Sequence, residues 1–251
     1  MPSGKPEAEG PGDETESDDI RLRLDSVGVA LVRSALNADQ LRLLLSTLRP
    51  STARGAVRHR SGQTYGARGL LTTIPELAEL LNLLSISQLV GDALRRPAFP
   101  IDAVFFDKHA NANWSVPGHQ DVVVPLPRGV DANLVPRRRF RDGLTYGEPP
   151  ESVLTELVAL RIHFDASDED GGALCVVPGS HLRGRVRETE LSDLPIEAYQ
   201  PCCAAPGDLL LLKPLVIHRS GKSTRSTHRR VLHVLYAPTD GWHGRHSYEA
   251  A

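Results

Sequence analysis

Three side chains of metal-ligand type stand where strand patterns begin or end. In His119-Gln120-Asp121 the two ligand-type residues are separated by one residue, so on an extended chain both project to the same side. A motif this short also arises by chance. His218 follows an apolar strand that begins after Pro206-Gly207-Asp208. Two imidazoles and one carboxylate can form a facial triad, which leaves three adjacent coordination positions open on Fe(II), as oxygen chemistry requires.

A second constellation follows the last of these histidines. Arg229 begins an apolar strand pattern over residues 229–236, and Ser220 lies two residues after His218. A guanidinium at the mouth of a strand can bind a carboxylate through two parallel hydrogen bonds, and a serine hydroxyl can donate a third. These residues therefore predict an anchor for a dicarboxylate.

Short apolar segments separated by Gly, Pro and Asp occupy most of the chain after residue 100. Many short strands with punctuated turns favour a sandwich or a barrel. The expected strands cover residues 101–106, 122–124, 157–164, 173–177, 209–212 and 231–236.

Alternation within residues 157–165 predicts two different faces. Every second residue from Val158 to Phe164 is apolar, whereas Arg161, His163 and Asp165 point the other way. This polar row either lines a cavity or faces solvent, and the alternation favours neither. If the row lines a cavity, Arg161 would reach a bound cosubstrate or substrate. The alternative is that Arg161 forms a salt bridge within the barrel.

The remaining segments frame one catalytic-sized domain, expected over residues 20–251. Residues 1–19 are rich in Gly, Pro, Ser, Asp and Glu and are expected to be disordered. A capping box at residues 37–40 begins a helix, and a second helical region spans about 75–94, both expected to pack outside a sheet. Residues 126–152 show no period and predict a long loop or lid beside the site.

Composition excludes several classes of partner. The formal net charge is −2 and the pI about 6.6, so no nucleic-acid partner is expected. No apolar stretch approaches the roughly 18 residues of a membrane span, and the amino terminus is polar and acidic, which favours the cytoplasm. The three cysteines form no metal or redox motif and are expected to be reduced. Nothing in the sequence indicates the oligomeric state.

Taken together, the motifs resemble the phytanoyl-CoA dioxygenase family of Fe(II)- and 2-oxoglutarate-dependent oxygenases. The resemblance extends over about residues 25–238, in the expected order and spacing. The matching elements are His119-x-Asp121, the segment 172–181 (GALCVVPGSH), the Pro206-Gly207-Asp208 turn, and His218-x-Ser220 with Arg229.

The resemblance implies a mainly β fold with flanking helices, a double-stranded β-helix of the jelly-roll, cupin-like kind. It implies Fe(II) on His119, Asp121 and His218, with 2-oxoglutarate chelating the iron and its distal carboxylate held by Arg229 and Ser220. O2 is the second cosubstrate, succinate and CO2 are released, and a small-molecule substrate is hydroxylated by default.

Particular residues refine this expectation. Asp121 argues against halogenation, because related halogenases lack the carboxylate, whereas desaturation, cyclisation and epimerisation use the same triad. Arg161 stands where acyl-CoA enzymes of the family carry a tryptophan, which argues against an acyl-CoA substrate. Arg219 and Ser223 replace the Gly and Asn that are common after the distal histidine, so the pocket rim is expected to differ.

Two other functions stay open. One is a cupin-type metal enzyme that does not use 2-oxoglutarate, for which Arg229 would be unimportant. The other is a catalytically silent binding protein on the same fold, against which the intact triad counts.

Further polar residues have a structural and a functional interpretation. His181 is expected in a turn or supporting role, since three ligands are already assigned. His163 and His233 either point into the cavity or are satisfied in the core. Gln120 projects away from its two neighbours and is expected to be structural.

Near the proposed strand ends, Asn113 and Trp114 either line the pocket or pack in the core, with packing favoured for Trp114. The basic cluster Arg137–Arg141 could attract an anionic substrate to the lid. A solvated loop is the interpretation that its composition favours.

Overall fold

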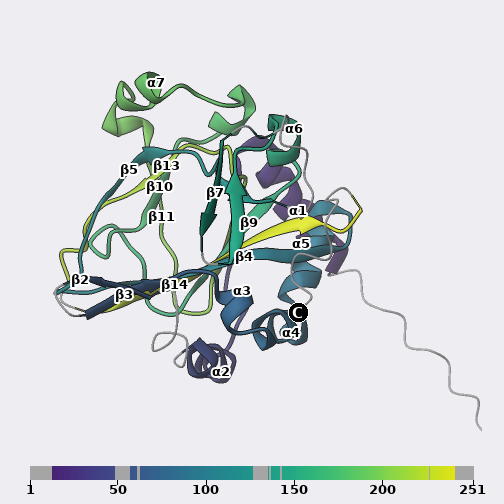
Figure 1. Cartoon of the computed structure of the whole chain (residues 1–251), viewed down its shortest axis with the longest axis vertical. Helices are drawn as coiled ribbons and strands as arrows, with labels where there is room; N and C mark the ends of the chain where they lie inside the picture. Colours follow the sequence, from purple (N-terminus) through teal and green to yellow (C-terminus); the bar gives the residue numbers. More distant parts are fainter. Residues whose placement is uncertain are drawn as a thin grey trace, which may run out of the picture.

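Two antiparallel sheets and one small three-stranded sheet form the framework of the computed structural model, which describes residues 13–48, 57–60, 63–126, 135, 137–141, 143–225 and 227–240 (Figure 1). The larger sheet has the order β1 (Val29–Val32), β12 (Leu209–Leu212), β9 (Val158–His163), β14 (Arg229–Pro238), β4 (Ala98–Lys108), β3 (Gln63–Ala67), β2 (Val57–Arg60). The smaller sheet has the order β11 (Gln200–Cys202), β10 (Leu174–Val176), β13 (His218–Ser220), β5 (Val116–His119). The third has the order β6 (Val124–Pro125), β8 (Leu144–Gly147), β7 (Arg138–Arg141).

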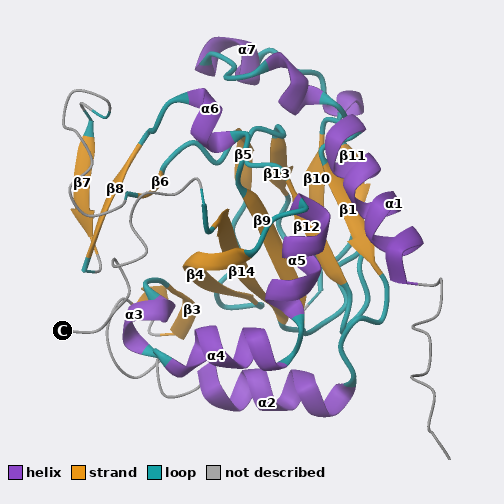
Figure 2. Ribbon diagram, turned by 90° about the vertical axis from the view of Figure 1, so that its right-hand side faces the viewer, coloured by secondary structure: helices purple, strands orange, loops and turns teal. Residues whose placement is uncertain are grey.

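Helices cover the outer face of the larger sheet (Figure 2). They are α1 (Asp13–Ser26), α2 (Ala38–Leu48), α3 (Leu70–Thr73), α4 (Glu76–Leu83) and α5 (Ile86–Leu94). Shorter helices lie between later strands: α6 (Glu151–Leu154), η2 (Ser180–Arg183), α7 (Glu188–Ser192) and η3 (Ile196–Ala198). The predicted capping box is present at the start of α2, where Asn37 Oδ1 accepts from the backbone N–H of Gln40 and Gln40 Oε1 accepts from that of Asn37.

Period-two alternation assigns the strand residues to two apolar clusters. On β9, Val158, Leu160 and Ile162 pack with the helices. Ala159, on the opposite face of β9, packs with residues of the smaller sheet such as Leu174. The two sheets therefore face each other across a shared interior, as the predicted double-stranded β-helix requires, and that fold class is confirmed.

The longest strand pair, β4 with β14, forms one wall of this interior. Its register shifts between Leu235 and Tyr236, so Ile101 has no partner. This bulge turns Ile101 toward the cluster between the sheets, whereas Ala103 and Phe105 pack against the helices. Asp102, Val104, Phe106 and Lys108 consequently face the interior.

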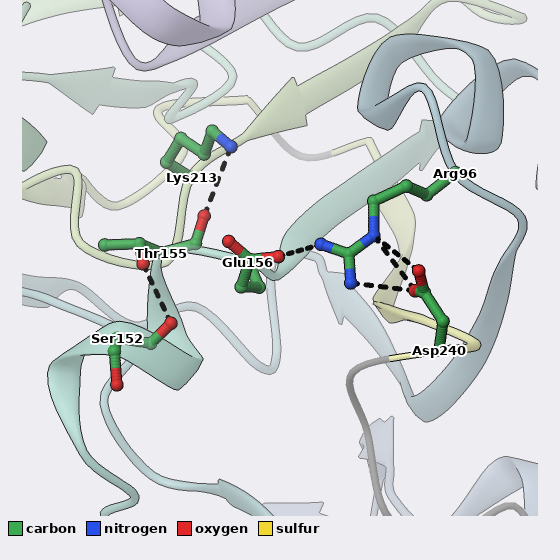
Figure 3. Close-up of polar contacts among 6 residues, drawn as sticks. All are labelled: Arg96, Ser152, Thr155, Glu156, Lys213 and Asp240. Atoms are coloured by element: carbon green, nitrogen blue, oxygen red, sulfur yellow. Dashed lines mark hydrogen bonds and ion pairs between the residues drawn. The ribbon is translucent and has the colours of Figure 1, made fainter.

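An ion-pair network fixes one end of this wall (Figure 3). Arg96, just before β4, binds Asp240, just after β14, with Nε and Nη2 donating at 2.9 and 2.8 Å, and Nη1 donates to Glu156, just before β9. Lys213 Nζ donates to the carbonyl of Thr155 at 3.3 Å. Together these contacts tie the ends of four adjacent strands, β12, β9, β14 and β4.

Four predicted segments differ from the structure. In place of the expected strand over residues 122–124, Val122 and Val123 lie outside any strand and β6 spans Val124–Pro125. Helix α1 begins at Asp13, so residues 13–19 of the expected disordered tail are helical, while residues 1–12 lie outside the described residues. The helical region over 75–94 is two helices bent by 72°. Residues 126–152 contain the β7–β8 hairpin and α6 instead of an irregular loop, with 127–134, 136 and 142 outside the described residues. Cross-strand hydrogen bonds hold this hairpin together, although its apolar residues show no clear alternation.

Among the described residues, no single helix is long and apolar enough to cross a membrane. Only the bent pair α4 and α5, taken together, has the required length and apolarity.

Candidate active site

Strand pairing brings the two predicted histidine ligands together. His119 ends β5, His218 begins β13, and the register places them directly opposite each other, with ring centroids 4.2 Å apart. Asp121 follows β5 and is held by its backbone N–H, which donates to the Pro214 carbonyl at 2.8 Å. The Asp121 carboxylate lies 3.5 Å from His119 Nε2 and 3.6 Å from His218 Nε2.

Backbone carbonyls fix which ring nitrogen faces this carboxylate. His119 Nδ1 lies 3.0 Å from the Pro117 oxygen, and His218 Nδ1 lies 2.9 Å from the Val216 oxygen. A carbonyl can only accept, so both Nδ1 atoms carry the proton and both Nε2 atoms are free to bind a metal. The three ligand atoms lie within 4.8 Å of one another, close enough to hold one ion.

The charge states suit a divalent cation. Burial lowers the pKa of His218 to about 4, which keeps its imidazole neutral. For His119, burial lowers the pKa, but the adjacent Asp121 outweighs it and raises the net value. Burial alone would raise the pKa of Asp121, yet the surrounding histidines hold it well below its usual range. An ionised carboxylate beside imidazole nitrogens is the donor set that non-haem Fe(II) takes.

Lys108, Ser220 and Arg229 meet at one end of the interior. Arg229 lies opposite Lys108 in the register, and both side chains are buried. Lys108 Nζ donates to Ser220 Oγ at 3.0 Å and to the Gly221 carbonyl at 2.7 Å. Among the described residues, Arg229 Nε and Nη1 have no hydrogen-bond partner. Buried cations without a counter-charge are costly, so this end is built to receive an anion.

A cavity of about 640 Å³ joins the triad to these cations. Its wall includes Arg161 and His233, whose side chains lie at the level of the triad: His233 Nε2 is 4.0 Å from Asp121, and Arg161 Nη1 is 3.5 Å from His233 Nδ1. The polar row on β9 therefore lines a cavity at Arg161. The volume is in the usual range for a small-molecule site.

The other histidines have structural surroundings. His163 is buried with Nδ1 3.4 Å from the Asp208 carbonyl. His181 lies outside the cavity, where Nε2 is 3.1 Å from the Asp25 carbonyl. Gln120 is structural as predicted, because its amide donates to the carbonyls of Gly184 and Leu215.

The remaining predicted residues divide between cavity and loops. Trp114 lines the cavity, with Lys108 Nζ 5.1 Å from its ring centre, although packing was the favoured expectation. Asn113 instead ties two loops through Ser223, whose N–H and carbonyl it binds at 2.9 and 2.6 Å. In the basic cluster Arg137–Arg141, Arg138 to Arg141 form β7, and Arg141 packs over the Tyr146 ring.

The sequence interpretation missed Lys108 and Asp102, which also line the cavity. Asp102 alternates with apolar residues on β4, so the argument that was applied to residues 157–165 would have placed it on one face, whereas Lys108 stands between Asp107 and His109 and carries no such signal. Whether these two side chains are buried depends on the pairing of β4 with β14, which could not be predicted from the sequence.

The fold and the site define a double-stranded β-helix protein with a His-Asp-His facial triad. The family model "Phytanoyl-CoA dioxygenase (PhyH)" matches residues 24–231, and the chain belongs to this family. The predicted enzyme class, non-haem iron enzymes that depend on 2-oxoglutarate, is thereby confirmed. No curated protein sequence matches the chain significantly.

Solved structures share the fold at low sequence identity. EctD from S. alaskensis, with 2-oxoglutarate and 5-hydroxyectoine, has a TM-score of 0.69 and 16% identity, covering 93% of this chain and 80% of its own. The epimerase SnoN from nogalamycin biosynthesis has a TM-score of 0.65 and 13% identity, covering 90% and 82%. The carbocyclase SnoK from the same biosynthesis has a TM-score of 0.65 and 16% identity, covering 92% and 87%.

Proposed function

We propose that this protein is an Fe(II)- and 2-oxoglutarate-dependent oxygenase that hydroxylates a small molecule and releases succinate and CO2. The observation that carries the proposal is the pair Arg229 and Lys108, two buried cations that open on the same cavity as the triad. A dicarboxylate reaching from the triad to this pair would satisfy both.

His119, Asp121 and His218 would hold the iron, with their Nδ1–H groups fixed on backbone carbonyls. The bound iron and 2-oxoglutarate would supply the oxidising chemistry. Arg229 would bind the distal carboxylate through two N–H groups, with Lys108 and the Ser220 hydroxyl completing the anchor. Arg161 lies at the level of the triad, so we place it at the metal end of the cosubstrate or on the substrate.

The first test is spectroscopic. Anaerobic protein with Fe(II) should develop a visible charge-transfer band on addition of 2-oxoglutarate, and oxygen should then release succinate. Absence of both would reject the proposal. If metal binds but neither signal forms, the cupin-type function without 2-oxoglutarate is supported; if no metal binds, the silent binding protein is supported.

The reaction outcome needs a separate measurement. SnoN and SnoK are named an epimerase and a carbocyclase on the same fold, so the fold does not select hydroxylation. Hydroxylation inserts an oxygen atom from O2 into the product. Once a substrate is found, product labelled from 18O2 supports hydroxylation, and unlabelled product of changed connectivity or configuration rejects it.

A further inference from the structure

The register of β4 with β14 orders the cavity wall along one line. The pairs along it are Lys108 with Arg229, Phe106 with Val231, Val104 with His233, and Asp102 with Leu235. His233 marks the level of the triad, since its Nε2 lies 4.0 Å from Asp121. Strands rise about 3.4 Å per residue, so Asp102 is about 7 Å beyond this level, on the side away from Lys108.

Asp102 presents one free carboxylate oxygen at this far end. Its Oδ1 accepts from the backbone N–H of Ala103 at 2.9 Å and from the Tyr146 hydroxyl at 3.2 Å. Both hydrogen bonds that the described residues make to this carboxyl use Oδ1, which leaves Oδ2 for the cavity that Asp102 lines. Tyr146, on β8, therefore orients the carboxyl from outside the cavity wall.

The surroundings of Asp102 are apolar, with positive charge close by. Val104, Val123, Val124 and Leu235 line the same cavity, and so does the charged side chain of Arg68. Burial raises the pKa of Asp102 to about 6, against the opposing effects of its two hydrogen bonds and of the guanidinium groups of Arg68 and Arg141. The carboxyl is therefore mostly ionised at neutral pH and acts as a hydrogen-bond acceptor in a largely apolar part of the cavity.

We propose that Asp102 determines substrate specificity by accepting a hydrogen bond from a hydroxyl group of a neutral, mainly apolar substrate bound between it and the metal. This inference rests on the proposed function for the identity of the metal end. A carboxylate on the substrate would be repelled by Asp102. Arg68 and Arg141 already place positive charge near this carboxyl, and they would repel an ammonium group. A neutral hydroxyl is therefore the donor that the site favours.

Matched probes test this assignment. Cyclohexylmethanol, cyclohexylmethylamine and cyclohexanecarboxylate share one apolar ring and differ in the polar group. Each is titrated by calorimetry into anaerobic protein loaded with Fe(II) and 2-oxoglutarate, and also into protein without them. The variants are Asp102→Ala and Asp102→Asn, with Asp107→Asn as the matched control, because Asp107 lies on the same strand and pairs with exposed His228.

The alcohol should bind wild-type protein about tenfold more tightly than the other two probes, and Asp102→Ala should remove this preference. In Asp102→Asn the amide oxygen takes the place of Oδ1, to which the Ala103 N–H and the Tyr146 hydroxyl donate, so an NH2 donor faces the cavity instead of an acceptor. This variant should therefore also weaken alcohol binding, whereas Asp107→Asn should change it less than about threefold. Tighter binding of the amine, lost in Asp102→Asn, would overturn the hydroxyl assignment. Alcohol binding unaffected by Asp102→Ala, or no alcohol preference in wild type, would overturn the subsite.

The loaded and unloaded titrations separate the two proposals. Failure of the 2-oxoglutarate band in wild-type protein rejects the cosubstrate, whereas dependence of alcohol binding on Asp102 in unloaded protein still reports on the subsite. Tyr146→Phe removes the hydroxyl that orients Asp102 and should weaken alcohol binding without changing the 2-oxoglutarate band. An unchanged alcohol affinity in that variant would contradict the positioning role.

Discussion

Arg229 and Lys108 lie directly opposite each other on β14 and β4, and both are buried at the end of one cavity. Lys108 is tied to Ser220, while two nitrogens of Arg229 have no partner among the described residues. Burying two positive charges side by side is unfavourable because they repel each other, and a bound dianion would stabilise both. Substitutions at Arg229 and Lys108 are therefore the most direct test of the proposed cosubstrate site.

Replacing Arg229 should strongly weaken cosubstrate binding while sparing the metal. Arg229→Gln removes the fixed guanidinium, and we expect the Kd for 2-oxoglutarate to rise about 100-fold, because a buried charge pair loses one partner. The visible iron chelate band measures this directly. Arg230→Gln is the control, since Arg230 points outward to Asp165. Equal affinity in the Arg229 variant and wild type would refute the anchor.

Removing one imidazole of the triad should remove the metal. His218→Ala leaves a bidentate site, and we expect affinity for Fe(II) or Mn(II) to fall by about two orders of magnitude. Calorimetric titration under anaerobic conditions gives both stoichiometry and Kd. His228→Ala provides the comparison, because His228 is exposed and pairs with Asp107. Retained stoichiometric binding in His218→Ala would place the metal elsewhere.

The affinity for 2-oxoglutarate should fall as pH rises through the range near 7. Burial, then the charges of Arg229 and Arg161, lowers the pKa of Lys108 to about 7. Lys108 is thus protonated below this pH and neutral above it, and a carboxylate binds the protonated form. The Kd should rise by up to about tenfold per pH unit above pH 7.

Lys108→Met isolates this effect. The variant should bind 2-oxoglutarate more weakly at pH 6 and show a flatter dependence between pH 6 and 8, with iron saturating throughout. Lys222→Met, which alters an exposed lysine, should keep the wild-type slope. The same slope in Lys108→Met as in wild type would assign the titration to another group.

Gln120 should matter for stability. Its side chain donates to the carbonyls of Gly184 and Leu215 and accepts from the N–H of Val186 at 2.9 Å. Gln120→Ala leaves these backbone groups without their partner, and we expect the free energy of unfolding to fall by about 2–4 kcal/mol. Denaturant unfolding of the metal-free protein measures it. Gln40→Ala, at the exposed cap of α2, should cost about 1 kcal/mol. A similar loss in both variants would deny Gln120 this role.

Local patterns were sufficient where one element decides the outcome. The capping box at Asn37, the strand 209–212 and the direction of Gln120 away from its two neighbours depend only on nearby residues. They failed where pairing decides: the β7–β8 hairpin has too weak an apolar period to be predicted, yet cross-strand hydrogen bonds form it. Helix α1 is polar and lacked a periodic signal, although Ile20 and Leu24 are buried in the core.

The sequence by itself determined the ligand types and their order, and it placed His119 and Asp121 on one side of the chain, because spacing fixes which side of an extended chain a residue faces. Only the tertiary structure decided that His119 meets His218, that Arg229 meets Lys108, and that Asp102 lies beyond the metal level. These relationships depend on strand register and on the bulge at Ile101, which arise from the packing of two sheets and not from any local pattern.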